Sequence, residues 1–457
     1  MLASATAAAL FRRNLPREHG FVPLTVEGAL PPALTGTLYR NGPGIFELFG
    51  RRYSHPFEGD GAITAIRLEG GRAHGACRIT ATAGLCEERA AGAMRYGWSA
   101  PWWRRVSNAA RSRMKNTANT SVLLWQGRLF ALMEAGRPVE LDPVSLATMG
   151  ERDLGGVVGA TFSAHPHRVA ARRATYNFGL VHGRRSRIEL YELPDAGQAR
   201  RLGSVPLPTP TMIHDFAVSG RHAVFFVSPA RIDLPRAVTG IGPFLELFRW
   251  QPGQGTEIIV APLDQPAAAV RFTVPAFHQW HFANAYDDGD VVVVDYCRYP
   301  DLASLGAVGQ VDGGGARALA AVRLHRARVD LRAGSLVSDA MCDLPCDFPV
   351  VAPGDEGAAH RFIWVADADL GGIARVDTRD GSIDRHRIGV GQAVTEPVVV
   401  GAGDALYALT LGHDAHSDRA FLAVYDACTV GAGPVARCWF AHHVPITFHG
   451  TWGAASP

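Results

Sequence analysis

The chain has 457 residues and a net charge of +2, with 47% hydrophobic and 19% charged residues. This hydrophobic content supports a large buried core and excludes an intrinsically disordered protein. The near-neutral charge gives no reason to expect a nucleic-acid partner.

The first residues, MLASATAAALFRRNLP, place a short apolar run before the arginines, whereas a secretory signal has its positive charge first. No stretch of about 18 apolar residues follows, so no transmembrane helix is predicted. The seven cysteines form no CxxC pair, which is typical of free thiols in a reducing compartment. We therefore expect a cytoplasmic protein that contacts membranes, if at all, only at their surface.

Short runs rich in Val, Ile, Leu and aromatic residues predict β-strands along the chain. These runs are residues 62–68, 120–124, 128–133, 223–227, 256–261, 291–296, 362–366, 398–400, 405–411 and 420–425. Turn signals such as Asp288-Gly289 and Asp380-Gly381 separate them. Helical spacing is convincing only over residues 102–115. The pattern predicts an all-β closed or radial architecture in one domain, residues 1–457, although it does not fix the number of blades.

The segment PWWRRV at residues 101–106 is the most interface-like part of the sequence. It has two interpretations. It is either a partly buried aromatic turn, or a surface that touches a bilayer or a lipid carrier.

Four histidines stand in distinctive local contexts: His165 in TFSAHPH, His214 in MIHDF, His281 in HFANAY and His449 in FHGTW. Their separations of 49, 67 and 168 residues are far too long for a metal site on one helix. In a radial β structure, however, strands from different blades converge on one axis. Imidazole suits iron, copper, nickel or zinc, but an isolated histidine is more often a packed or surface residue, so the spacing alone identifies no site.

Further segments occur in a recognisable order: LTGTLYRNGPG at 34–44, HPFEGDG at 55–61, NTANT at 116–120, EAG at 134–136 and VPITFHGTW at 444–452. Together with the histidine segments, they resemble the carotenoid cleavage oxygenase family. That family includes apocarotenoid oxygenases, stilbene-cleaving dioxygenases and the visual-cycle retinoid isomerohydrolase. The resemblance covers nearly the whole chain.

The resemblance implies a seven-bladed β-propeller with a cap of loops and short helices over an iron(II) ion on its axis. The family motifs assign the iron ligands to His165, His214, His281 and His449. They place the ligand before Pro in the first segment and three residues before Asn-Ala in the third. The nearby His167 and His278 are therefore expected to lie outside the ligand set.

In the family, three carboxylates accept the other ring N–H of ligand histidines and so orient them. The resemblance assigns this role to Glu134, Asp347 and Glu396. The family's usual Glu-Phe-Pro is replaced by Asp347-Phe348-Pro349 in this chain. Because aspartate is one methylene shorter, we expect Asp347 to approach its partner, His281, more closely or to act through water.

The implied reaction is the oxidative cleavage of a C=C double bond by dioxygen to two carbonyl products. Phe57 and Met133 suit the wall of an apolar tunnel, and Tyr96 is a candidate for binding a phenol. Stilbene-cleaving members place a lysine just before the first carboxylate, where this chain has Met133, and Lys115 is its only lysine. A carotenoid or apocarotenoid is therefore the expected substrate.

Three alternatives stay open. The substrate could be a smaller aryl alkene, either a phenylpropene or a stilbene-like compound. The same iron could serve an isomerase or a hydrolase, as in the visual-cycle member. The propeller could also be a binding module without a metal. The sequence does not indicate an oligomeric state.

Overall fold

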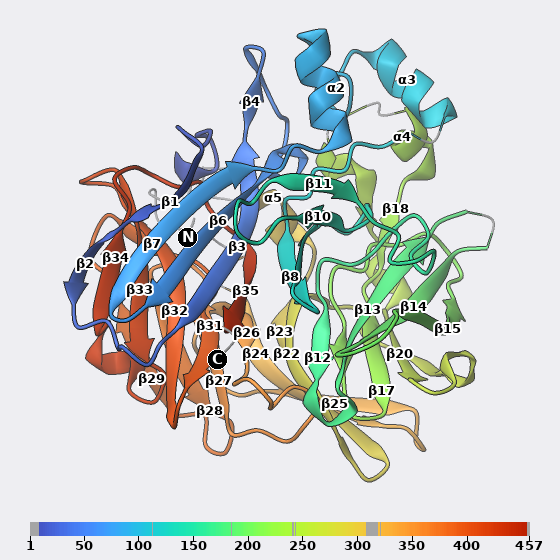
Figure 1. Ribbon diagram of the computed structural model, residues 1–457. Helices are drawn as coiled ribbons and strands as arrows, with labels where there is room; N and C mark the ends of the chain where they lie inside the picture. Colours follow the sequence, from blue (N-terminus) through green and yellow to red (C-terminus); the bar gives the residue numbers. More distant parts are fainter. Residues whose placement is uncertain are drawn as a thin grey trace.

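The computed structural model describes residues 9–111, 113–183, 185–239, 242, 244–307, 319 and 321–454. Seven antiparallel sheets of four or more strands stand around a common axis (Figure 1). The expected seven-bladed β-propeller is therefore confirmed. All ten strands predicted from the sequence lie in or overlap observed strands.

Each sheet is a row of strands in which every strand pairs with the next one. The first three sheets contain β1 (His19–Pro23), β7 (Arg72–Ile79), β6 (Asp60–Glu69), β3 (Gly36–Ile45) and β35 (His449–Ala454); β11 (Thr148–Glu151), β10 (Val139–Leu141), β9 (Arg128–Leu132) and β8 (Ser121–Trp125); and β12 (His167–Val169), β13 (Ala174–Val181), β14 (Arg187–Pro194) and β15 (Arg200–Pro206). The next two contain β16 (Ala217–Val218), β17 (His222–Val227), β20 (Thr256–Pro262) and β21 (Val270–Val274); and β22 (His278–Asp288), β23 (Val291–Tyr299), β24 (Arg323–Asp330) and β25 (Ser335–Ala340). The last two contain β26 (Cys346–Val350), β27 (Phe362–Asp367), β28 (Gly372–Asp377) and β29 (Ile383–Arg387); and β2 (Thr25–Gly28), β34 (Ala436–Trp439), β33 (Arg419–Asp426), β32 (Ala405–Asp414) and β30 (Gln392–Val394), with β31 (Val398–Ala402) also on β32.

The ring is closed by strands from the two ends of the chain. Near the C-terminus, β35 pairs with β3, so that His449 lies opposite Asn41. Near the N-terminus, β2 pairs with β34 and completes the last sheet. The first and last sheets are therefore each built from both ends of the sequence.

The hydrophobic core lies between neighbouring sheets. One cluster, for example, packs the sheet of β13 against the sheet of β17 through Phe178, Phe216 and Phe225, whose rings are 5.1–5.3 Å apart. Strands buried on both faces need apolar side chains on both, which explains continuous runs such as residues 291–294. Tight hairpins join the strands: Gly289, with φ +64°, turns β22 into β23.

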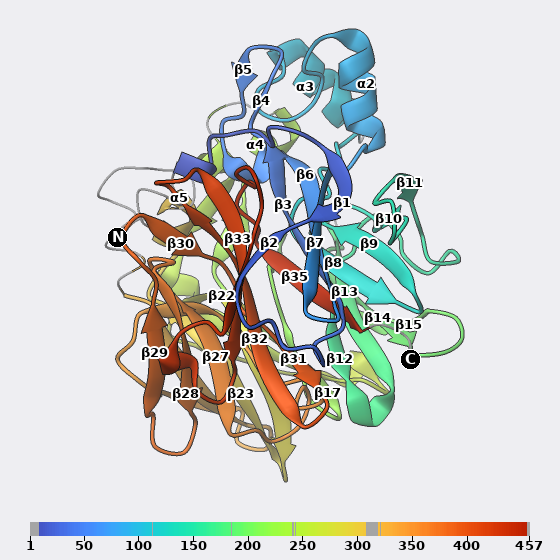
Figure 2. The same ribbon diagram turned by 60° about the vertical axis from the view of Figure 1, so that its left-hand side comes forward.

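The helices and one of the two smallest sheets gather at one end of the propeller and form a cap (Figure 2). The helices are α2 (Ala83–Ala91), α3 (Trp102–Ala110), α4 (Leu234–Thr239) and α5 (Ala303–Ala307), and the sheet pairs β4 (Glu47–Leu48) with β5 (Arg51–Arg52). The second small sheet pairs β18 (Ala230–Ile232) with β19 (Phe248–Trp250), and β18 lies below α4 (Figure 1). Six 3₁₀ turns complete the described structure: Pro56–Glu58, Ala170–Arg172, Phe244–Leu247, Pro252–Gln254, Pro266–Ala268 and Val430–Ala432.

The helix expected over residues 102–115 ends earlier, at Ala110. Lys115 instead lies in a buried ionic cluster, and these ion pairs, not helical spacing, determine the course of the chain there. Trp102 and Trp103 are 67% and 50% exposed, so the reading of this segment as a partly buried turn is wrong. Among the described residues, no helix is long and apolar enough to span a membrane. The seven cysteines are all free.

Candidate metal centre

Four histidines meet on the propeller axis. His165 precedes β12, His214 precedes β16, His281 lies in β22 and His449 begins β35, so each comes from a different blade. All four are at most 9% exposed, and one nitrogen of each lies within 4.8 Å of the corresponding atoms of the others. The Nε2 atom of His214 is 3.0 Å from that of His165 and 3.4 Å from that of His281. The structure thus brings together the four histidines singled out in the sequence.

Three carboxylates contact the outer ring nitrogens of three of these histidines. The Nδ1 atoms of three histidines face carboxylate oxygens: His214 faces Glu134 at 2.5 Å, His281 faces Asp347 at 2.9 Å and His449 faces Glu396 at 2.8 Å. Although burial opposes it, the neighbouring imidazoles lower the pKa values of all three carboxyl groups. Ionised carboxylates accept the Nδ1–H protons and leave the Nε2 lone pairs pointing to the centre.

A cation fits this arrangement. His214 and His281 both donate from Nδ1 to a carboxylate, so each has only a lone pair at Nε2, and lone pairs 3.4 Å apart repel one another unless a positive charge lies between them. Four nitrogen donors suit iron, nickel, copper or zinc. Burial lowers the pKa of His165 well below its usual value, and the other histidines of the cluster add to this, which keeps its ring neutral for a metal.

Asp347 reaches His281 directly, without the water that its shorter side chain could have required. Its second oxygen accepts a 2.5 Å hydrogen bond from the Tyr299 hydroxyl. The next residue, Phe348, has φ +55°, in the left-handed region that a phenylalanine rarely adopts. Tyr299, which sequence analysis did not single out, therefore fixes the carboxylate in place.

Replacing Tyr299 with phenylalanine is expected to weaken metal binding by up to about 10-fold, because Asp347, the carboxylate that orients the ligand His281, loses its own hydrogen-bond donor. Competition with a chelator measures the affinity. Tyr296→Phe is the matched control: Tyr296 lies on the same strand and is also buried, but its hydroxyl contacts Ser338 Oγ. Equal affinities of the two variants would show that Tyr299 does not support the centre.

Arg40 is a second supporting residue that sequence analysis quoted only as part of a motif. Its guanidinium is fully buried and donates to Glu396 Oε2 at 2.7 Å. Further hydrogen bonds run to the side chains of Thr395 and Thr447 and to the carbonyl of Phe448. Arg40 therefore compensates the buried charge of Glu396 and connects it to the strand that carries His449.

His167 and His278, the two neighbouring histidines that the motifs left out of the ligand set, lie outside the cluster. His167 has both ring nitrogens on carboxylates, Asp215 at 3.1 Å and Glu356 at 3.3 Å. Burial opposes it, but these two hydrogen bonds raise the pKa of His167 to about 10. His278 faces Ser228 Oγ at 3.1 Å, and burial together with His214 lowers its pKa to about 3.

His167→Gln is expected to cost about 1.5–3 kcal/mol of stability in mildly acidic buffer, because two hydrogen bonds to charged groups lose the imidazolium. A raised pKa stabilises the fold fully below the unfolded value of 6.5, and this contribution is lost as the pH rises towards about 10. Chemical unfolding at both ends of this range measures the difference. A cost independent of pH would contradict an imidazolium at this position.

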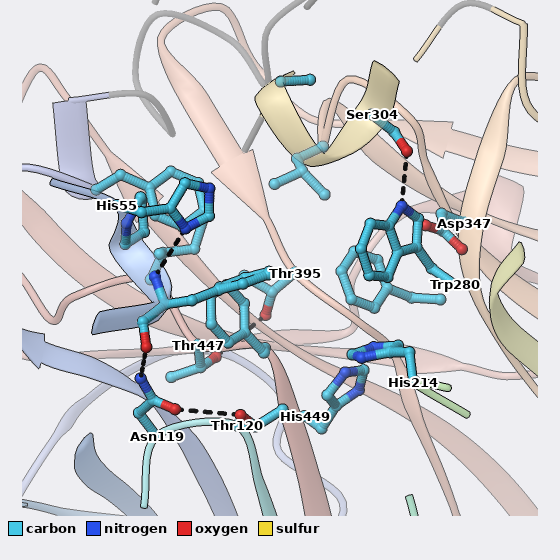
Figure 3. Close-up of a pocket in the computed structure, with 18 of the residues that line it drawn as sticks. His55, Asn119, Thr120, His214, Trp280, Ser304, Asp347, Thr395, Thr447 and His449 are labelled. Carbon is cyan, nitrogen blue, oxygen red and sulfur yellow. Dashed lines mark hydrogen bonds between the residues drawn. The ribbon is translucent and has the colours of Figure 1, made fainter. Parts of the chain in front are cut away.

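A cavity of about 480 Å³ opens directly onto the four-histidine cluster. Figure 3 shows His214 and His449 at one side of it, with Trp280 and His55 on the surrounding walls. Apolar side chains form much of the lining: Phe11, Phe46, Phe57, Met133, Trp280, Leu319, Phe348, Leu370, Ile446 and Phe448. Phe57 and Met133 thus lie where a tunnel wall was expected. Tyr96 lies elsewhere, beside α2, and its hydroxyl donates to Glu87.

The chain is similar to known proteins over almost its whole length. A family model described as retinal pigment epithelial membrane protein matches residues 12–454. The chain is 31% identical to apocarotenoid-15,15'-oxygenase of Synechocystis sp., over 96% of this chain and 94% of that protein. It is 26% identical to isoeugenol monooxygenase of Pseudomonas putida, over 94% of each chain. A solved structure of cobalt-substituted Synechocystis apocarotenoid oxygenase covers 100% of both chains, with a TM-score of 0.90 and 29% identity.

Proposed function

This chain belongs to the family of the retinal pigment epithelial membrane protein and the carotenoid oxygenases, and on that premise we propose that it is an iron(II)-dependent dioxygenase that cleaves a C=C double bond of an apocarotenoid. The enzyme class expected from the sequence agrees with the relatives, which are named as oxygenases. The observation that carries the proposal is the buried four-histidine cluster at the wall of an apolar cavity.

The proposed ligands are His165, His214, His281 and His449, and the existence of a cobalt-substituted structure of a similar protein supports a metal in a protein of this fold. Iron(II) bound there would supply the activation of dioxygen. The chain itself holds three of the four rings in the Nδ1–H tautomer through Glu134, Asp347 and Glu396. Because the four proposed ligands are neutral imidazoles, the negative charge near a bound ion would come from these three carboxylates behind them.

The cavity supports an extended apolar substrate. Its volume of about 480 Å³ is in the range that takes up drug-sized ligands, and a single-ring alkene would leave much of it unfilled. Arg12 and Arg52 have exposed side chains and also line it, so the cavity reaches the surface where they offer donors to an oxygenated end group.

Recognition of a hydroxystilbene is less well supported. Met133 occupies the position of the phenol-binding lysine, and its sulfur accepts from the backbone N–H and hydroxyl of Thr117. Lys115 is held by Asp60 and Glu88, and the hydroxyl of the cavity residue Tyr53 donates to Asp60. A smaller aryl alkene stays the second candidate because isoeugenol monooxygenase is among the relatives.

The test is anaerobic reconstitution with iron(II), followed by exposure to labelled dioxygen with an apocarotenoid, a stilbene or a phenylpropene. We expect two carbonyl products from the apocarotenoid, with label incorporated. Faster cleavage of the phenylpropene would overturn the assignment of an apocarotenoid as the substrate. A rearranged product without label would indicate an isomerase. The absence of any turnover in iron-loaded protein would favour a binding module.

We further propose that the outer face of α3 contacts a membrane surface, from which an apolar substrate can enter. Trp102, Trp103 and Val106 are 67%, 50% and 43% exposed, and Arg104 and Arg105 follow the two tryptophans. The helix lies in the cap, at the same end as β5, whose Arg52 lines the cavity (Figure 2). Aromatic residues beside arginines are typical of segments that lie in the membrane interface.

The double variant Trp102→Ser/Trp103→Ser is expected to bind anionic vesicles at least about tenfold more weakly, because burying one large apolar side chain contributes about 1.5–3 kcal/mol. Vesicle flotation measures the bound fraction. Val390→Ser is a suitable control, since Val390 is 94% exposed on another part of the ring. Equal flotation of the double variant and wild type would argue against membrane contact through α3.

A further inference from the structure

A second cluster of metal-binding side chains lies at the seam where the ring closes. His19 is on β1, Cys77 is opposite it on β7, and His442 follows β34 of the last sheet. One ligand atom of each lies within 4.8 Å of the others. β1 pairs with β7 as the edge strand of the first sheet, and β2, which pairs with β34, contacts β7 (Figure 1). These three residues form the seam cluster, which takes no part in the proposed oxygenase centre.

The hydrogen bonds of the two seam histidines determine which ring nitrogen carries the proton. His19 Nδ1 lies 2.8 Å from the carbonyl oxygen of Gly20, and His442 Nδ1 lies 2.7 Å from that of His443. A carbonyl oxygen can only accept, so each Nδ1 must carry a proton. A neutral imidazole has a single N–H, and both rings have therefore used theirs.

The two Nε2 atoms nevertheless face each other at 2.8 Å. With both ring protons on Nδ1, two lone pairs meet at hydrogen-bond distance, which is unfavourable unless a cation lies with them. In the axial centre, His214 and His281 show the same signature, with their Nδ1 atoms on carboxylates and their Nε2 atoms 3.4 Å apart. The seam cluster thus repeats, in the same chain, the arrangement that marks the proposed iron site.

Cys77 adds a soft donor. Its thiol is fully buried and makes only a long contact, of 3.8 Å, to Thr64 Oγ1. Two imidazoles and one thiolate match the donor types of zinc sites, in which water can take the fourth position. Burial raises the pKa of Cys77 to about 12, while the nearby Arg17 favours the thiolate, so a metal ion must displace the thiol proton.

We propose that His19, Cys77 and His442 bind a zinc ion that joins the first and last blades. On binding, the Zn²⁺ ion forms bonds to His19 Nε2, His442 Nε2 and Cys77 Sγ, and one proton leaves the thiol to solvent. Because β1 belongs to the first sheet and His442 follows a strand of the last one, the ion crosslinks the closure of the ring. The alternative to a zinc ion is a proton shared between the two Nε2 atoms, which would make His19 and His442 a hydrogen-bonded imidazolium–imidazole pair.

The test uses the full chain, freed of metal and titrated with Co²⁺ as a spectroscopic substitute for zinc. The axial centre offers only nitrogen ligands, so a sulfur-to-cobalt charge-transfer band reports a thiolate site. We expect two bound ions in wild type together with this band. In His281→Ala, one ion is lost and the band is kept, whereas in His442→Gln one ion is lost together with the band.

Cys77→Ser should also abolish the band. Because Cys77 is buried and His442 is partly exposed, substitution of His442 disturbs folding less, so His442→Gln is the main test. Added Zn²⁺ should raise the melting temperature of His281→Ala but not that of the double variant His281→Ala/His442→Gln, in which neither centre is complete, a readout independent of activity. A single bound ion in wild type, with no charge-transfer band and no zinc-dependent stabilisation of His281→Ala, would overturn the proposal and leave the shared proton.

Discussion

Replacing His281 with alanine is expected to abolish metal binding at the axis and alkene cleavage with it. Its Nε2 atom lies 3.4 Å from that of His214, and its Nδ1 atom is fixed by Asp347. Loss of an outer partner alone typically costs about 10- to 100-fold in metal affinity or activity, so loss of a ligand should exceed about 100-fold. Metal analysis of purified protein and product formation measure the two effects.

The matched control is His278→Ala, on the same strand and three residues earlier. Both side chains are buried, at 8% exposure for His281 and 2% for His278, but only His281 belongs to the cluster. The control should keep its iron and its activity per folded molecule. If both variants lost iron equally, or if His281→Ala kept full activity, the assignment of the centre would be wrong.

Replacing Lys115 with methionine is expected to destabilise the protein by about 3–5 kcal/mol, because two buried carboxylates lose their cation. The Nζ atom of Lys115 lies 2.6 Å from Asp60 and 2.7 Å from Glu88, and both carboxylate side chains are fully buried. Asp60 begins β6 in the first blade and Glu88 lies in α2, so the ammonium connects the cap to the propeller. Equilibrium unfolding in denaturant measures the loss.

Arg113→Met removes a cation two residues away and serves as the control. Its ion pair with Glu87 is largely exposed, with side chains 48% and 39% accessible, and such pairs contribute about 0–1 kcal/mol. The double variant Lys115→Met/Glu88→Gln should recover part of the stability lost in Lys115→Met. An equal cost for Lys115→Met and Arg113→Met would contradict a buried ionic cluster.

The sequence predicted those features that depend on local motifs. The context of each histidine distinguished His281 from His278 and His165 from His167, and the structure brings together the set that the motifs selected. The number of blades followed from resemblance, because the blades share no repeated motif. The strands themselves were predictable, since each is a short β-branched run between turn residues.

Features that depend on contacts between distant residues could not be predicted. Tyr299 reaches Asp347 from 48 residues away, and Arg40 reaches Glu396 from 356 residues away. The seam histidines His19 and His442 are 423 residues apart and stand in no distinctive motif. The end of α3 was missed because the burial of Lys115 overrides the helical pattern beyond Ala110.

The closure of the ring also sets an order in time. Protein synthesis runs from the N-terminus, so the histidines at 165, 214 and 281 are made well before His449. Until β35 exists, β3 has no inner neighbour, and a growing chain presents three imidazoles on an open ring. The fourth donor and the strand that encloses the axis arrive together, after the strands of the other blades. Loading of the proposed ion is thereby tied to the synthesis of β35, and a product that ends before His449 would lack the fourth ligand.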